Sequence, residues 1–187
     1  MGGAVSTYCD IAPGHEFHGP YHDTEYGFPL LDDNELFERL VLEINQAGLS
    51  WLLMLKKREA FRKAFRNFDV AKVARFTAKD EARLLADAGI IRNRLKVAAA
   101  IENAKRIQAI QREHGSFAAW IAINHPLSKK DWVKLFAKTF KFTGGEIVGE
   151  FLMSIGYLPG AHRLDCPTQR KIARLKPPWL QVKGFKY

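Results

Sequence analysis

Apolar residues recur along this chain at the three- and four-residue spacing of amphipathic helices. Between residues 34 and 47 they fall on one helical stripe, formed by Leu36, Phe37, Leu40, Val41, Ile44 and Ala47. The alternation of polar and apolar residues that a half-buried strand would show is nearly absent. The pattern therefore predicts an all-α fold.

Capping residues and glycines predict where further helices begin and end. Ser50 is placed to cap a helix that runs through the basic cluster at 56–58, and Thr77 with Asp80 forms a capping box for a helix that should stop at Gly89. The remaining predicted helices cover about 94–114, Ser116 to the residue before His125, 132–140 after a Ser128 cap, about 146–155, and a short turn at 170–175.

Composition limits the class of protein. Of 187 residues, 47% are hydrophobic and 12% aromatic, which predicts a globular chain. No apolar run is long enough to cross a bilayer and no secretory signal precedes residue 8, so we expect a cytoplasmic protein without a membrane partner. The formal charge of +9 favours a polyanionic partner, with nucleic acid first, although a merely solvated basic surface would give the same number.

Both cysteines have a histidine at a spacing that a metal ion can use. Cys9 precedes His22 by thirteen residues, and His162 precedes Cys166 by four. Two thiolates and two imidazoles are a tetrahedral donor set suited to structural zinc. A disulfide or two buried small hydrophobic residues are the alternatives. One ion would join the chain ends, so we expect a single unit, 1–187, with a tied part (about 1–30 and 157–187) around a helical body (about 31–156).

The stretch Phe-Lys-Phe-Thr-Gly-Gly, residues 140–145, separates two predicted helices. Adjacent glycines allow a tight turn whose amides, with those of the next helix start, form an anion site. We expect Phe140 and Phe142 to anchor this turn in the core and Lys138 and Lys141 to add positive charge. This is the layout of a helix-hairpin-helix element gripping a DNA phosphate; an ordinary helical corner is the alternative.

A second stretch, residues 42–51, places Glu43 near the end of one predicted helix and Trp51 at the start of the next. An indole face attracts cations and a buried carboxylate accepts hydrogen bonds from amino and ring N–H donors. Together they are suited to bind a flat, electron-poor ring. A core tryptophan and a solvated glutamate are the alternatives.

Taken together, the motifs resemble the DNA-3-methyladenine glycosylase I family of the helix-hairpin-helix glycosylases. The resemblance covers about residues 9–166. It rests on Tyr-His-Asp-x-Glu-x-Gly at 21–27, Glu-x-x-Gln-Ala-Gly-Leu-Ser-Trp at 43–51, Leu-Lys-Lys-Arg at 55–58, Asp-Ala-Gly-Ile-Ile-Arg at 87–92, Phe-Lys-Phe-x-Gly at 140–144 and the two Cys/His pairs.

The resemblance implies a set of functional residues and partners. One structural zinc ion would be held by Cys9, His22, His162 and Cys166, with no organic cofactor. Glu43 would contact the alkylated adenine as the catalytic and base-binding acid, with Tyr21 and Trp51 stacking on the ring. Backbone phosphate of double-stranded DNA would be bound by Lys141, Thr143, Gly144 and Gly145. The enzyme would act as a cytoplasmic, nucleoid-associated monomer.

The implied reaction is hydrolysis of the N-glycosidic bond of a flipped 3-methyladenine, in base excision repair. Bifunctional relatives carry a lysine shortly after the hairpin glycine, where this chain has Gly145 and Glu146, so no lyase activity is expected. Gly149 stands where the family usually has tyrosine, and Tyr26 where it has tryptophan, which leaves open whether other N3-alkylated purines are accepted. A damage-binding protein that has lost excision, or a zinc-stapled module for RNA or protein, are the other hypotheses.

Overall fold

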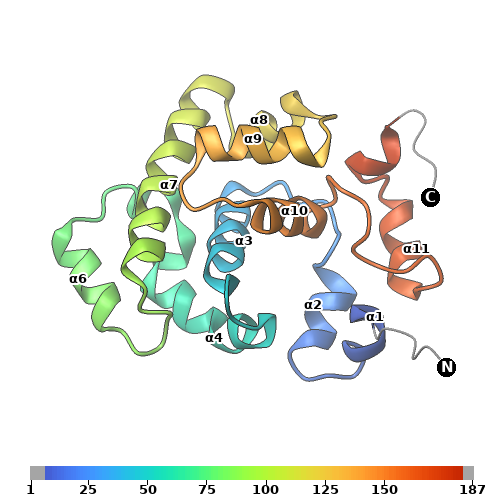
Figure 1. Cartoon of the computed structure of the whole chain (residues 1–187), viewed down its shortest axis with the longest axis horizontal. Coiled ribbons are helices and arrows are strands. Elements are labelled where there is room, and N and C mark those ends of the chain that lie inside the picture. The colour runs from blue at the N-terminus through green and yellow to red at the C-terminus, as the bar shows by residue number, and fades with distance from the viewer. Residues whose placement is uncertain (1–6, 183–187) are drawn as a thin grey trace. The chain divides into compact units, whose positions relative to one another are not determined.

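The computed structural model describes residues 7–182, and every regular element in that range is helical (Figure 1). The prediction of an all-α fold is confirmed. In chain order the elements are α1 (Tyr8–Ile11), α2 (His18–Thr24), α3 (Asp33–Gln46), α4 (Trp51–Ala64), η1 (Arg66–Phe68), α5 (Val70–Val73), α6 (Ala78–Ala86), α7 (Arg94–His114), α8 (Phe117–Asn124), α9 (Lys129–Thr139), α10 (Gly145–Ser154), α11 (Pro167–Arg174) and η2 (Pro178–Gln181). Within 7–182, none of these helices combines the length and apolar character that a bilayer crossing needs.

The predicted caps form, but three helices differ in their bounds from the prediction; one is α11, a helix from Pro167 to Arg174 where a short turn at 170–175 was expected. Ser50 accepts a hydrogen bond from the Leu53 amide at 3.3 Å, and Thr77 with Asp80 makes the capping box. Helix α6 ends at Ala86 rather than at Gly89, because Asp87 leaves the helical region and its side chain accepts from the Gly89 amide at 2.8 Å. Helix α9 begins at Lys129, directly after its cap, and not at Trp132.

The chain divides into two compact units, which we call the terminal unit (Met1–Pro29 with Leu152–Tyr187) and the central unit (Leu30–Phe151). In the terminal unit, α2 packs against α11. Gly27 follows α2 with φ +84, and its amide donates to the Ser154 carbonyl at 2.8 Å. A Cβ at Gly27 would lie 2.8 Å from that of Ala161, so only glycine fits this approach.

In the central unit, α7 is the longest helix and packs against α3, α5, α6 and α8 (Figure 1). Glu38 of α3 is buried and forms ion pairs with Arg58 and Arg62 of α4, which fix the two helices together. The core near α8–α10 is aromatic and contains Phe117, Trp120, Phe136, Phe140 and Phe151. These contacts hold the α3–α4 corner and the α9–α10 connection, which carry the predicted chemistry of this unit.

Candidate functional site

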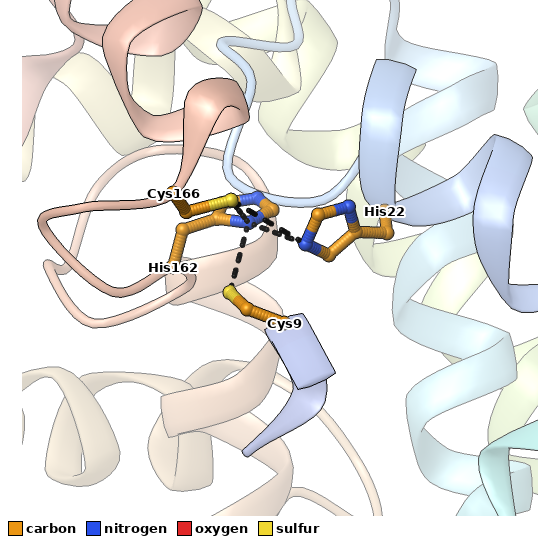
Figure 2. A group of neighbouring side chains, drawn as sticks. All are labelled: Cys9, His22, His162 and Cys166. Atoms are coloured by element: carbon orange, nitrogen blue, oxygen red, sulfur yellow. Dashed lines mark hydrogen bonds between the residues drawn. The ribbon is translucent and has the colours of Figure 1, made fainter. Parts of the chain in front are cut away.

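Four side chains from both ends of the chain meet in the terminal unit (Figure 2). Cys9 lies on α1, His22 on α2, His162 in the loop before α11, and Cys166 at the N-cap of α11. One donor atom from each lies within 4.8 Å of all the others. Both cysteines are free thiols, so the disulfide alternative is excluded. The structure therefore brings together all four residues that the sequence predicted.

The spacing of these donor atoms fits a tetrahedral metal ion. His162 Nδ1 lies 3.1 Å from His22 Nε2 and 3.6 Å from Cys9 Sγ, and Cys166 Sγ lies 3.7 Å from His22 Nε2. Ligands at about 2.0–2.3 Å around a tetrahedral centre would be about 3.3–3.8 Å apart. A hollow of about 300 Å³ lined by Cys9, His22 and Cys166 gives a path by which an ion can enter.

Each imidazole has a hydrogen-bond partner on the ring nitrogen that points away from the cluster. These partners determine the tautomer, and so which nitrogen can bind a metal. His162 Nε2 donates to the Tyr26 carbonyl at 2.7 Å, and His22 Nδ1 lies 2.7 Å from an Asp23 carboxylate oxygen. Each ring therefore carries its proton on the outside and turns a lone pair inward. Two lone pairs 3.1 Å apart repel each other unless a cation lies between them. The donor chemistry thus fits a bound metal ion.

Burial around the cluster acts on both kinds of ligand. It raises the pKa of the Cys9 thiol and lowers the pKa of His162. Neutral imidazole is the form that binds a metal, whereas a thiol must lose its proton to do so. The Arg163 amide points at Cys9 Sγ from 3.4 Å, which favours the thiolate.

In the central unit, residues 140–144 connect α9 to α10, at the position of the predicted hairpin. Phe140 is buried in the aromatic core as expected. The expectation for Phe142 is wrong: its side chain is 40% exposed, because a left-handed backbone conformation with φ +61 turns it outward. Lys141 and Gly144 are exposed, and a Cβ at Gly144 would meet nothing within 4 Å. The turn is therefore open to a ligand.

Thr143 is the buried member of this turn. It is 8% exposed, and its hydroxyl has no hydrogen-bond partner among the described residues. Gly145 begins α10, so its amide lies at the start of a ten-residue helix, where N–H groups have no intrahelical partner. The start of α10 therefore offers backbone N–H groups beside an exposed Lys141, with Glu146 as the acidic residue of its first turn.

Glu43 lies near the C-terminal end of α3 and lines a hollow of about 320 Å³ in the central unit. The hollow is bounded by Glu43, Gln46, Ala47, Gly48 and Leu49 and by Glu146, Ile147 and Glu150 of α10. Glu43 is buried, and this burial raises its pKa to about 8; Arg39 lowers the pKa and Glu150 raises it further. The acid is therefore mostly protonated at neutral pH and sensitive to any cation that enters.

Neither of the two predicted stacking residues is among the residues that line this hollow. Trp51 is half-buried as the first residue of α4, and it does not line the hollow that Glu43 faces. Tyr21 is buried on α2 in the terminal unit, with its ring 5.5 Å from that of Tyr26. Their association with Glu43 around one base stays a prediction.

Sequence reasoning missed the buried polar residues on α7 and the acid on α10. Lys96 and Asn103 are buried on α7 and bond the backbone of the α3–α4 turn and of the hairpin. Their signal was a lysine and an asparagine among the apolar positions of one long helix. Glu150, one turn after Glu146, gave no signal beyond its charge.

Known proteins match this chain in sequence and in structure. A family model described as methyladenine glycosylase matches residues 12–134. The DNA-3-methyladenine glycosylase of Haemophilus influenzae is 36% identical over 184 residues, covering 88% of this chain and 99% of the relative. DNA-3-methyladenine glycosylase 1 of Escherichia coli is 38% identical over 165 residues, covering 78% and 88%.

One solved structure is that of 3-methyladenine DNA glycosylase I from Staphylococcus aureus, described as showing the basis of 3-methyladenine recognition. Its sequence is 32% identical to this chain. It covers 86% of this chain and 95% of its own, with a TM-score of 0.76. A second structure of such an enzyme, with 3-methyladenine bound, is also 32% identical, with a TM-score of 0.77 and coverages of 86% and 96%.

Proposed function

The chain belongs to the methyladenine glycosylase family, and we propose that it is a monofunctional DNA glycosylase that hydrolyses the N-glycosidic bond of 3-methyladenine in alkylated DNA. The observation that carries the proposal is Glu43, a buried acid that lies within the segment matched by the family model and faces a hollow. The matched relatives are named for the same activity.

Glu43 supports selectivity through its charge state. Desolvation keeps this acid largely neutral in the free protein, with a pKa of about 8. A purine methylated at N3 carries a positive charge, so its entry favours the ionised carboxylate and gains the attraction between the two charges. Undamaged adenine is neutral and gains nothing comparable. The pocket therefore distinguishes the two bases by charge.

The reaction needs little covalent help from the protein. As the bond between the sugar C1′ and purine N9 breaks, its electrons cancel the positive charge of the base, which leaves neutral. Water adds to C1′ and releases a proton. Gly145 and Glu146 occupy the region where bifunctional relatives carry a lysine, so no amine is available there for a covalent sugar intermediate or for lyase chemistry.

The remaining predicted residues have supporting roles in this proposal. Tyr21 and Trp51 stack on the extruded base. Lys141, Thr143, Gly144 and Gly145 hold a phosphate of duplex DNA, which fits the exposed, basic turn and the net charge of +9. Cys9, His22, His162 and Cys166 hold one zinc ion, which supplies structural cross-linking and no chemistry at the base. We propose that the enzyme acts as a monomer.

The test is release of 3-methyladenine from methylated duplex DNA, followed chromatographically. We expect release by the wild-type protein and a loss of about 10²-fold or more in the Glu43→Gln variant. Glu35→Gln is the matched control, because Glu35 is an exposed acid on the same helix. Duplex binding without base release would overturn the proposal in favour of a damage-binding protein.

The same variant separates two roles of Glu43. Free 3-methyladenine binding is measured beside single-turnover excision. A larger loss in excision than in base binding would support a part for Glu43 in steering water. Equal losses would limit it to recognition.

A further inference from the structure

We propose that α7 fixes the spacing between the phosphate-binding hairpin and the Glu43 hollow, with Lys96 and Asn103 as positioning residues. The inference rests on the proposed function and deepens it. Each residue bonds the backbone of one of the two sites, and both lie on one face of a single helix. Neither side chain needs to touch DNA for this role.

Lys96 holds the turn that forms one wall of the hollow. It is only 5% exposed, and its Nζ donates to the carbonyls of Asn45 at 2.9 Å and Ala47 at 2.7 Å. Those carbonyls lie at the end of α3, where a helix leaves its last acceptors unsatisfied and where a positive charge is favoured. The chain then turns at Gly48 with φ +79. Lys96 therefore sets the position of Ala47 and Gly48, which line the hollow beside Glu43.

Burying the Lys96 ammonium group at the end of α3 has a desolvation cost. Burial lowers the pKa of Lys96, which shows that desolvation opposes its charge. An apolar side chain of the same length would avoid this cost but would leave the Asn45 and Ala47 carbonyls without this donor. The two hydrogen bonds offset the cost of desolvation and fix the backbone of this turn.

Asn103 holds the hairpin in the same manner. Its side chain is completely buried, accepts from the Lys141 amide at 2.7 Å and donates to the Lys141 carbonyl at 3.0 Å. This two-way pairing fixes both polar groups of one residue inside the turn. Arg106, three residues further along α7, adds a bond from Nη1 to the Thr139 carbonyl at 2.7 Å. The hairpin is thus attached to α7 through its backbone.

Lys96 and Asn103, which we call the two clamps, lie on the same face of α7. Seven residues are close to two helical turns, so Lys96 and Asn103 share a face and are about 10.5 Å apart along the axis. The Lys96 ammonium also lies 6.0 Å from the centre of the Phe142 ring in the hairpin. A flipped nucleotide stays covalently joined to the DNA backbone whose phosphates the hairpin binds. The distance between the hairpin and the hollow therefore decides whether the base reaches Glu43. Misplacement by about 1 Å can cost about 10²-fold in rate.

The experiment uses the full-length protein and separates the clamps by their readouts. Single-turnover excision of 3-methyladenine at saturating protein and the Kd for an unmethylated duplex are measured for each variant. We expect Lys96→Met to lower the saturating rate by about tenfold or more with the duplex Kd within about twofold. We expect Asn103→Ala to raise the duplex Kd by about tenfold, because the Lys141 amide loses its partner, with a smaller effect on the saturating rate.

Controls distinguish positioning from general damage. Lys105→Met removes the same charge from an exposed site on α7 and should leave both readouts unchanged. Lys96→Arg keeps donors and charge and should recover most of the rate. If Lys96→Met does not fold, Lys96→Gln, which loses the charge and is too short to reach both carbonyls, replaces it, and Asn103→Asp, which keeps the acceptor for the Lys141 amide but loses the donor to its carbonyl, replaces Asn103→Ala.

Equal losses in both readouts for both clamps, or no loss in either, would overturn the inference. If the wild-type protein releases no 3-methyladenine, the proposed function fails instead. The duplex Kd of Asn103→Ala and hydrogen exchange of residues 45–50 in Lys96→Met would still test the two clamps. Unchanged duplex affinity and unchanged exchange would then refute them independently of activity.

Discussion

Glu43 is an acid that the fold keeps protonated over much of the neutral pH range. Burial raises its pKa from 4.5 to about 8, and the neighbouring Glu150 acts in the same direction while Arg39 opposes it. In the unfolded chain the acid ionises near its ordinary value. Between pH 4.5 and 8, therefore, only the unfolded state has released this proton, so the free energy of unfolding falls as pH rises through that window.

Substitution of Glu43 by glutamine should consequently stabilise the protein in a pH-dependent way. We expect no gain near pH 4, where both states hold the proton, and a gain of up to about 3 kcal/mol at pH 7. Urea denaturation at pH 4.5 and 7.5 measures the difference, with Glu35→Gln as the exposed control. A gain of the same size at both pH values would contradict the raised pKa. A variant that is more stable and less active would show that this acid is retained for function.

At the scale of the elements, one side chain joins three helices. Asp33 is the first residue of α3, yet its carboxylate accepts from the amides of Phe117 at 2.8 Å and Ala118 at 3.0 Å, at the start of α8. Gln111 of α7 donates to the same carboxylate at 2.7 Å. A negative charge at a helix N-terminus is favourable, so Asp33 fixes α3, α7 and α8 together.

Removal of this carboxylate should be costly for an acid that is not fully buried. We expect Asp33→Ala to lower the free energy of unfolding by about 2–3 kcal/mol, because three donors lose their acceptor at once. The control is Glu35→Ala, two residues away on the exposed side of α3. Equilibrium denaturation measures both. A loss below 0.5 kcal/mol, which is about what a surface substitution gives, would show that water replaces the cap.

Local signals in the sequence were sufficient for the long helices and insufficient for the short ones. Ser50, Thr77 and Ser128 act as caps because capping depends on residues three positions away, which the sequence displays. Helices α1 and α2 have four and seven residues and depend on tertiary packing, so periodicity could not reveal them.

Some features of the candidate site were also predictable from the sequence and others were not. The four Cys/His ligands were predictable, because few residue types bind zinc and the chain has only two cysteines. The exposure of Phe142 was not, since it follows from a single left-handed φ in the hairpin. Lys96 and Asn103 stand out as polar residues at apolar positions, but their partners are backbone groups about 50 and 38 residues away, which the sequence does not identify.

At the scale of the whole molecule, the Cys/His cluster closes a very long loop. Cys9 and His162 are 153 positions apart, and their donor atoms lie 3.6 Å from each other. Closing a loop of this length costs several kcal/mol of chain entropy, which a bound ion offsets because it binds the folded arrangement and not the unfolded chain. Without the ion, the terminal unit would keep two inward lone pairs and two buried thiols at its centre.

Metal removal should therefore act on stability through this cluster alone. We expect one zinc per chain by elemental analysis, and a fall in Tm of about 10 °C when a chelator removes it. Cys166→Ser should retain little zinc and melt near the chelated wild type, with no further change on chelation. Asp165→Asn, an exposed change in the same loop, should keep both the metal and the Tm. If the chelator lowered the Tm of Cys166→Ser as much as that of the wild type, the stabilising ion would have to bind elsewhere, because this variant lacks one of the four donors.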